Sequence, residues 1–430
     1  MWKLPVFAIM LASQVNCWSK EQLKVTKVIM SASGDLDERF FEQLMGDKSY
    51  LNVWNSETTR LVVTSDNPMD TLIIMEAPRL NELVLYPNVH LKHLLLRYCP
   101  LDGLVKSLRN LRALRVLKLE LCQIGGTFNL AELLALQNLT TFSVESNRIS
   151  EILLQPDDAI EEMDPASTLK ILDLSSNVIE HFNLNVLRAF PMLNELVLAR
   201  NRLVTVAGSI FLQTLEVLNV KRNLLTELDL SGCNCSSLRY VYASENKLNT
   251  FPLFGDSITD LQVLDLNYNL LAVLNVSELK KQQHLSTLML ADNVLKSFNV
   301  DDGNETMVEL ASLELLELSN NQIESLDLRG WQLPALQVLR AMNKPLVTIP
   351  DDLLERYPKL IRLACFCPNV DCEWIQRNVE HIRNHKYEMN VAQQGSSQLG
   401  KGYRCVTVPY VGCVLCPFRR KDSELTESVR

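Results

Sequence analysis

The sequence predicts an α/β solenoid, a horseshoe of stacked coils with a parallel β-sheet on its concave face. Three observations support this fold class. A template of apolar positions, LxxLxLxxNxL, begins eleven times between Leu91 and Leu336, at steps of 22 to 30 residues. Its central leucines alternate with variable residues, which is the pattern of a half-buried strand. An asparagine closes most matches, where its amide can bond backbone groups of its own turn and of the next repeat.

The eleven matches share one register, and each begins at a leucine: Leu91, Leu114, Leu139, Leu169, Leu193, Leu215, Leu238, Leu261, Leu285, Leu313 and Leu336. This repeat resembles the leucine-rich repeat family, and the resemblance covers about residues 61–360, or about 11–13 units. One unit cannot bury its own apolar edge, so stacked units must share a leucine core. Units near 23 residues leave little length for helices, so we expect short 3₁₀ turns and irregular loops on the convex side.

The N-terminal region departs from the template. Residues 1–17 carry Lys3 before an apolar run and end on small residues, which predicts a signal peptide. Residues 18–60 read as strands of an N-terminal cap without cysteines. Between Met69 and Leu96, three apolar pairs follow one another at intervals of only 11 residues: Leu72–Ile74, Leu83–Leu85 and Leu94–Leu96. The sequence alone does not assign the register of these repeats.

Cysteines concentrate after the last repeat, where residues 361–418 predict a disulfide-rich C-terminal cap, followed by a polar tail at 419–430. We expect disulfides at Cys365, Cys367, Cys372, Cys405, Cys413 and Cys416, for which fifteen pairings exist. Cys233 and Cys235 lie on an outer loop and pair either with each other or with another chain. His381 and His385 have zinc-like spacing, but thiols oxidise outside the cell. We therefore expect no metal and no cofactor.

Composition and charge limit the classes of function. The chain has 430 residues, 47% of them hydrophobic, and a formal net charge of −9 without an evident basic stripe, so neither nucleic acid nor anionic lipid is an expected partner. No run after the signal peptide reaches the roughly 20 apolar residues of a membrane span. Removing Cys17 with the signal peptide leaves ten of the eleven cysteines. Four N-x-S/T sites predict glycosylation in the same oxidising compartment: Asn138, Asn234, Asn275 and Asn304.

The variable strand residues predict a partner-binding surface. Tyrosines and cations gather where the middle strands face away from the leucines, and these types dominate protein-binding hot spots. The predicted binding residues are Arg200, Lys221, Arg222, Tyr240, Tyr242, Asp265 and Tyr268. The alternative is an ordinary solvated sheet face on which such neighbours only pair across strands. Two acidic insertions, in residues 155–167 and 300–309, offer a second surface or simply solvated loops.

The cysteine-rich tail, with "DCEW", a single Cys405 and the closing Cys413-Val-Leu-Cys416, resembles the leucine-rich repeat immune proteins of mosquitoes. That resemblance implies secretion, innate immune defence, disulfide-linked homo- or hetero-oligomers and an extracellular partner such as a complement-like thioester protein. No heptads follow Cys416, so the chain is most similar to a coil-less member. A cell-surface adhesion or co-receptor ectodomain and an extracellular enzyme inhibitor are the alternatives. No catalytic motif is present, so we do not expect an enzyme.

Overall fold

The computed structural model describes residues 26–30, 36–37, 41, 49–101, 106–155, 167–274, 276–297, 307–342, 345–365, 367, 369–389, 391–392 and 403–417. The chain divides into two compact units, Met1–Asn177 and Val178–Arg430. The predicted signal peptide and polar tail lie outside the described residues, as do most of both acidic insertions, and these remain predictions.

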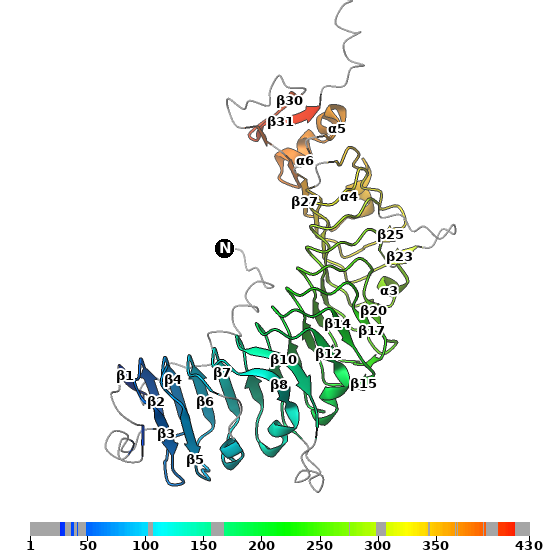
Figure 1. Ribbon diagram of the computed structural model, residues 1–430. Helices are drawn as coiled ribbons and strands as arrows, with labels where there is room; N and C mark the ends of the chain where they lie inside the picture. The colour runs from blue at the N-terminus through cyan, green and yellow to red at the C-terminus, as the bar shows by residue number, and fades with distance from the viewer. Residues whose placement is uncertain are drawn as a thin grey trace, which may run out of the picture. The chain divides into compact units, whose positions relative to one another are not determined.

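The N-terminal unit contains a parallel sheet in which each coil contributes one strand (Figure 1). Its strands, in spatial order, are β1 (Thr26–Met30), β2 (Tyr50–Trp54), β4 (Thr71–Met75), β6 (His93–Arg97), β7 (Val116–Glu120), β9 (Thr141–Ser143) and β11 (Ile171–Asp173). The register is regular, so that Leu72, Leu94 and Leu117 are paired across neighbouring strands. The sheet thus extends into the region predicted as an N-terminal cap.

The crowded section between Met69 and Leu96 is explained by a second wall of short strands. Figure 1 shows β3 (Arg60–Val63) and β5 (Glu82–Leu85) on the side of the coil opposite β2 and β4. Leu72–Ile74 and Leu94–Leu96 are therefore sheet positions of successive coils, whereas Leu83 and Leu85 belong to the outer wall. The other outer elements of this unit are η2 (Lys106–Asn110), β8 (Gly125–Asn129), η3 (Leu130–Ala135) and β10 (Arg148–Leu153), with β8 and β10 paired in parallel.

The C-terminal unit repeats this plan. Its main parallel strands are β13 (Glu195–Val197), β16 (Val217–Asn219), β19 (Tyr240–Tyr242), β21 (Val263–Asp265), β22 (Thr287–Met289), β24 (Leu315–Glu317), β26 (Val338–Arg340), β27 (Arg362–Cys365) and β28 (Tyr387–Met389). A 3₁₀ turn of the kind predicted is present as η4 (Leu184–Ala189), and the outer side also has a short α-helix, α3 (Val276–Lys280), among the described residues between the sheet strands β21 and β22.

Short parallel strand pairs also line the outer wall of this unit, which the sequence did not predict. They are β12 (His181–Asn183) with β14 (Thr205–Ala207), β15 (Ile210–Phe211) with β18 (Cys233–Asn234), β17 (Asp229–Leu230) with β20 (Leu253–Phe254), and β23 (Val308–Glu309) with β25 (Trp331–Gln332). The outer segments stack so closely that a Cβ at Gly232 would lie 2.7 Å from the carbonyl oxygen of Gly208. Glycine is therefore required at this contact.

The leucine columns form the core. Leu196, Leu218, Leu264 and Leu288 are at most 1% exposed, and burying each such side chain contributes about 1.5–3 kcal/mol. Apolar residues also stand thirteen positions after the repeat starts, pack inside the outer wall and are buried wherever the structure describes them: Ile152, Phe182, Val206, Leu228, Phe251, Leu274, Leu326 and Ile349. The predicted solenoid is confirmed.

The template asparagines form a hydrogen-bonded ladder, which Asn269 illustrates. Its Nδ2 donates to the carbonyls of Leu266, at 3.0 Å in its own coil, and of Ala243, at 3.1 Å in the preceding coil. Its Oδ1 accepts the Leu248 N–H, at 2.9 Å, also in the preceding coil. The sequence predicts contacts with the next coil instead, and that prediction is wrong. Tyr268, directly before the asparagine, has a left-handed backbone (φ 54°). This conformation turns the Asn269 side chain into the core, toward the preceding coil.

Cysteines replace the asparagine in two coils of the N-terminal unit. Cys99 and Cys122 are buried free thiols. The Cys122 thiol donates to the carbonyl of Leu96 at 3.3 Å, much as an asparagine amide would. An asparagine at position 122 would accept a hydrogen bond from the Leu101 N–H through its side-chain oxygen. Here the Leu101 N–H donates to the Cys122 backbone carbonyl instead, at 2.8 Å. The ladder therefore tolerates cysteine because the backbone itself supplies the missing acceptor.

The C-terminal region forms the predicted disulfide-rich cap. It comprises α4 (Leu353–Arg356), α5 (Cys372–Arg377), α6 (Val379–Arg383), β29 (Val391–Ala392), β30 (Tyr403–Val408) and β31 (Gly412–Pro417). The last two strands form an antiparallel hairpin, and Asp371 caps α5 by accepting the Glu373 N–H. Trp374 stacks on Tyr387, with 5.3 Å between ring centroids, and both are buried. This covers the apolar end of the last coil.

Candidate functional site

The strongest candidate surface is the face of the C-terminal sheet that points away from the leucines. We call its predicted residues the sheet-face patch: Arg200, Lys221, Arg222, Tyr240, Tyr242, Asp265 and Tyr268. Within β19, Val241 is fully buried, so the alternation of a strand turns Tyr240 and Tyr242 to the opposite face. The register pairs Tyr242 with Asn219 on one side and with Asp265 on the other. Four neighbouring strands thus supply one surface.

Three members of the patch occupy one repeated backbone position. Arg200, Arg222 and Tyr268 each directly precede a ladder asparagine and have φ values of 57°, 58° and 54°. This left-handed conformation is unfavourable for a residue with a side chain and persists where the surroundings hold it in place. Here the asparagine ladder holds it. Tyr268 is 57% exposed and therefore presents its ring to solvent.

Ion pairs fix the cations at one end of the patch. The Arg222 Nε lies 2.6 Å from Glu245 Oε2, and the Lys221 Nζ lies 3.4 Å from Glu245 Oε1. Burial alone would raise the pKa of Glu245, but the hydrogen bond from Arg222 and the charges of Lys221 and Arg222 together lower it. Arg200 is exposed and makes no ion pair with any residue that the structure describes. Its guanidinium is available to an acidic group.

The two tyrosines of β19 are half-buried. The Tyr240 hydroxyl donates to Gln262 Oε1 at 3.0 Å. Burial raises the pKa of Tyr242, with smaller effects from Tyr240, Asp265 and Glu195. The Tyr242 hydroxyl therefore stays protonated at neutral pH and can donate a hydrogen bond. The two tyrosine rings add apolar area at a small cost in conformational entropy.

Asp265 lies on the same face but is only 4% exposed. Its Oδ2 accepts the Ser244 hydroxyl at 2.7 Å, and its Oδ1 accepts the Asn267 N–H at 3.2 Å. Burial raises the pKa of Asp265, although these two hydrogen bonds oppose the shift. The structure therefore brings Asp265 next to the tyrosines as a positioning residue rather than as an exposed contact.

Neighbouring residues that the sequence did not single out complete this face. Gln262 holds Tyr240, Glu245 holds both cations, and the Arg340–Glu317 ion pair, at 3.3 Å, lies farther along the sheet. The signal was available, since Glu245 occupies the same template place as Arg222 and Tyr268. The repeat register marks Glu245 as an outward residue, but it does not show that the carboxylate pairs with Lys221 and Arg222 of the preceding coil.

Comparison with known proteins agrees with this architecture, although no family model matches the chain. Two curated relatives are each 29% identical, over 192 and 170 residues: a protein phosphatase 1 regulatory inhibitor subunit PPP1R7 homolog of Arabidopsis thaliana and the transforming growth factor beta activator LRRC33 of Danio rerio. The matches cover 41% and 36% of this chain. The chain spans only 56% and 24% of the lengths of these relatives.

Solved structures match more of the chain. A leucine-rich repeat protein of Leptospira interrogans superposes with a TM-score of 0.58 at 22% identity and covers 87% of both chains. The APL1 leucine-rich repeat domain gives a TM-score of 0.55 at 18% identity, over 90% of this chain and 97% of that one. The FLRT2 repeat structure, solved in an octameric complex with Latrophilin 3 and Unc5D, gives 0.51 at 20% identity, over 69% and 87%. The chain has the leucine-rich repeat fold.

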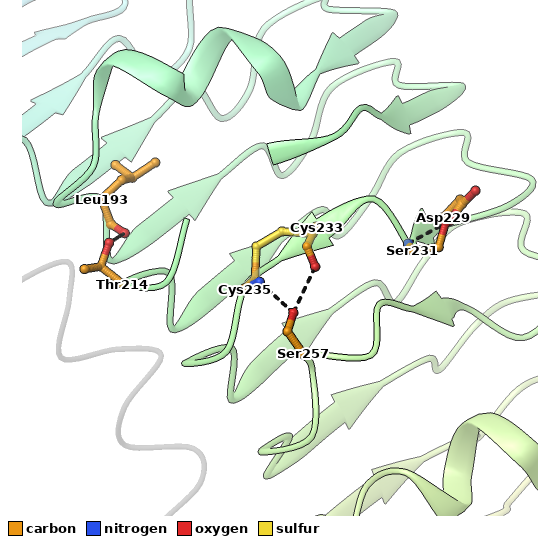
Figure 2. Close-up of a disulfide and its surroundings, with 7 residues drawn as sticks. All are labelled: Leu193, Thr214, Asp229, Ser231, Cys233, Cys235 and Ser257. Atoms are coloured by element: carbon orange, nitrogen blue, oxygen red, sulfur yellow. Dashed lines mark hydrogen bonds between the residues drawn. A yellow bond between two sulfur atoms is a disulfide. The ribbon is translucent and has the colours of Figure 1, made fainter. Parts of the chain in front are cut away.

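The outer wall of this leucine-rich repeat fold carries a disulfide between Cys233 and Cys235 (Figure 2). The Ser257 hydroxyl of the next coil donates to the Cys233 carbonyl at 3.2 Å and accepts the Cys235 N–H at 3.1 Å. Both half-cystines are buried. The disulfide therefore closes a tight turn within the chain and docks it onto the neighbouring coil.

The six cap cysteines form the remaining disulfides, Cys365–Cys367, Cys372–Cys416 and Cys405–Cys413. Burial raises the pKa of Cys99 to about 11 and that of Cys122 to about 12. The described residues contain no cluster of His, Cys, Asp or Glu that could hold a metal ion. His381 packs edge-on against Tyr387, with 5.5 Å between ring centroids.

Two of the four predicted glycosylation sites can be located. Asn138 and Asn234 are exposed, and the Asn138 amide donates to the Arg112 carbonyl at 2.9 Å. Asn275 and Asn304 lie outside the described residues. Within the described part of the chain, no helix is both long and apolar enough to span a membrane.

Proposed function

We propose that this leucine-rich repeat protein is a secreted recognition scaffold that binds another protein through the sheet-face patch and catalyses no reaction. The observation that carries the proposal is the convergence of Tyr240, Tyr242, Tyr268 and the neighbouring cations on one face. Tyrosine and arginine are the side chains most often responsible for binding energy at protein interfaces. The ladder behind them holds the backbone rigid, which lowers the entropy lost on binding.

The chemistry of the patch favours a partner with both an apolar anchor and acidic groups. Tyr268 is exposed and offers ring area, and Arg200 offers an unpaired guanidinium that can bond a carboxylate in a bidentate manner. The Glu245 carboxylate already neutralises part of the positive charge of Arg222 and Lys221. The FLRT2 repeat domain was solved together with protein partners, which supports a similar use of this fold here.

Four disulfides support an extracellular location, because structural disulfides persist in oxidising compartments. The resemblance of the cysteine-rich tail to mosquito immune proteins, together with the fold shared with APL1, supports a role in innate immune defence. On the same basis we propose a complement-like thioester protein as the partner class. Disulfide-linked oligomers are a further part of this proposal.

A matched pair of tyrosine variants tests the patch. Tyr98 in the N-terminal unit has the same left-handed place before a ladder position (φ 54°) and is 47% exposed, against 57% for Tyr268. Tagged wild-type protein, Tyr268→Ala and Tyr98→Ala are used to capture partners from extracellular fluid, followed by mass spectrometry. We expect Tyr268→Ala to lose at least about tenfold of the captured partner, as truncating a hot spot does, and Tyr98→Ala to retain it.

The triple variant Tyr240→Ala/Tyr242→Ala/Arg222→Ala extends the test to the two half-buried tyrosines and to the exposed Arg222. Unchanged capture by this triple variant would show that the patch is not the binding surface. Secretion is tested separately by following the protein in conditioned medium and in detergent extracts. Recovery only in detergent extracts would favour an adhesion or co-receptor ectodomain instead.

A further inference from the structure

A second surface, on the N-terminal unit, consists almost entirely of cations. From Lys106 to Lys118 every third residue is basic, and every third residue between them is leucine. The leucines Leu108, Leu111, Leu114 and Leu117 are at most 5% exposed. We call the five cations the basic ridge: Lys106, Arg109, Arg112, Arg115 and Lys118. The first four of these are the exposed residues of the segment, and Lys118 is half-buried.

Local backbone geometry aligns these cations. Lys106–Asn110 forms the 3₁₀ helix η2, and the N–H groups of Leu111 and Leu114 donate to the carbonyls of Leu108 and Leu111, at 2.9 and 3.1 Å. At three residues per turn, side chains three apart eclipse one another. The buried leucines therefore fix one side of the segment toward the core and leave the cations on the other. The ridge follows one coil from the outer wall into β7, where Lys118 lies between the buried Leu117 and Leu119 and therefore points away from the core.

A second row of cations crosses the ridge at Arg115. The Arg115 N–H donates to the Lys92 carbonyl at 2.7 Å, the Thr140 N–H donates to the Arg115 carbonyl at 2.8 Å, and the Lys170 N–H donates to the Thr140 carbonyl at 2.8 Å. These residues hold one template place in successive coils, about 4.8 Å apart. Asp70 holds that place in the coil before Lys92. This row thus consists of three cations, one carboxylate and Thr140.

The cations of the ridge and the row are not neutralised by ion pairs among the described residues. None of the seven forms an ion pair within the described part of the chain, although the net charge of the protein is −9. Burial lowers the pKa of His93, Asp70 opposes that effect, and the charges of Lys92 and Arg115 add to it. The sequence analysis predicts no basic stripe, and the fold shows that this prediction is wrong. The solenoid gathers residues that are 23 to 55 positions apart, from Lys92 to Arg115 and from Arg115 to Lys170.

We propose that the basic ridge and its crossing row bind a linear sulfated polysaccharide. Arginine forks and lysine ammonium groups recognise oxyanions by charge and hydrogen bonding. The inference rests on the extracellular location in the proposed function, where such polymers occur and nucleic acids are scarce. It does not involve the sheet-face patch.

Other polyanions fit the ridge less well. Single-stranded nucleic acid needs aromatic platforms for its bases, and residues 106–118 contain no aromatic side chain. A membrane surface would need the cations in one plane with apolar residues to insert, whereas the ridge curves around a coil and its leucines are buried. A protein partner would need an exposed apolar anchor, and the exposed residues of this segment are all cations.

Heparin oligosaccharides provide the probe, with chemically desulfated heparin of the same length as its control. Binding is measured by calorimetry or surface plasmon resonance for the parent full chain and for two triple variants. The ridge triple is Arg109→Ser/Arg112→Ser/Arg115→Ser, and the second triple is Arg188→Ser/Lys296→Ser/Lys359→Ser. The second triple removes three exposed cations elsewhere, so both variants change the net charge equally. All proteins carry Asn138→Gln, because a glycan at Asn138 would lie two residues from Thr140 in the crossing row.

We expect heparin to bind the parent and the second triple alike, and the ridge triple to bind at least about tenfold more weakly. The slope of log affinity against log salt concentration should become shallower by about 2 for the ridge triple, because each contact that is lost no longer releases counterions on binding. Equal binding by the ridge triple, or equal binding of desulfated heparin, would overturn the proposal. Binding to phosphatidylserine vesicles or to oligonucleotides but not to heparin would also overturn it.

The two proposals fail independently. If the protein is not secreted, or if the sheet-face variants keep their partners, the proposed function fails while heparin binding in solution is unaffected. If heparin does not bind, capture of protein partners by the sheet-face patch is unaffected.

Discussion

Replacing Asn269 by alanine tests the asparagine ladder most directly. Asn269 is 4% exposed, and its amide bonds one backbone N–H and three backbone carbonyls. All three carbonyls keep a second donor, since the Ala243 carbonyl also accepts from Asn246 at 3.0 Å, the Leu266 carbonyl from Asn293 at 2.9 Å and the Asn267 carbonyl from the Glu245 N–H at 2.9 Å. Only the Leu248 N–H, which donates to the Asn269 oxygen, would be left without this acceptor.

The expected destabilisation follows from this inventory. A buried N–H left without a partner costs about 1–3 kcal/mol, and each carbonyl that keeps a second donor loses an ordinary hydrogen bond of about 0.5–1 kcal/mol. Asn269→Ala should therefore lower the free energy of unfolding by about 2.5–6 kcal/mol. The effect should be local, with the turn between Leu248 and Asn269 opening most readily.

Urea denaturation followed by far-ultraviolet circular dichroism measures the total, and amide hydrogen exchange at Leu248 measures the local loss. Asn249→Ala is the matched control, because this neighbouring asparagine is exposed and should cost less than about 0.5 kcal/mol. If Asn269→Ala stays within about 0.5 kcal/mol of the wild type and the Leu248 amide remains protected, the ladder does not stabilise the coils as described.

Three further predictions concern sulfur and charge. Cys99 and Cys122 should not react with a thiol reagent at pH 8 in the native protein, since their pKa values are about 11 and 12. Both thiols should react once the protein is denatured in the absence of a reductant. If more than two thiols of the chain from residue 18 react, the disulfides are contradicted. Removing Cys372–Cys416, with a sequence separation of 44, should cost about 4 kcal/mol, and removing Cys233–Cys235, with a separation of 2, about 1 kcal/mol; denaturation of the two double-alanine variants in the reverse order would refute this. Because the pKa of Asp265 is raised, the folded state binds its proton more tightly, so stability falls as pH rises from the unfolded value through the folded one. Asp265→Asn should then unfold at higher urea than the wild type at pH 7 but not at pH 3, and a loss of stability at pH 7 would contradict the raised pKa.

Much of the fold was predictable because leucine spacing is dictated by the coil itself. Leu264 and Leu288 must alternate with outward residues if stacked strands are to share a core, so the sheet follows from the template. The outer strands were not predictable, since pairs such as Ile210–Phe211 and Cys233–Asn234 are too short to show any periodicity. The pair Leu83–Leu85 looked like another repeat because an outer-wall strand alternates in the same way as a sheet strand.

The candidate surfaces were predictable in part. Alternation alone places Tyr240 and Tyr242 on the outward face, but it gives no measure of depth, and the Ser244 hydroxyl that covers Asp265 lies in another coil. The basic ridge was missed because charge was summed along the chain rather than by template position. The run of cations at every third residue from Lys106 was visible, and its meaning depended on a 3₁₀ turn that aligns them.

The direction of the asparagine contacts has a consequence for how such chains change over generations. Each amide bonds only its own coil and the one before it, so a gene rearrangement that deletes or duplicates one whole unit leaves every surviving amide with equivalent neighbours. A rearrangement that breaks within a unit does not. Lineages can therefore lengthen or shorten the molecule in steps of one coil and vary the outward residues freely at each step.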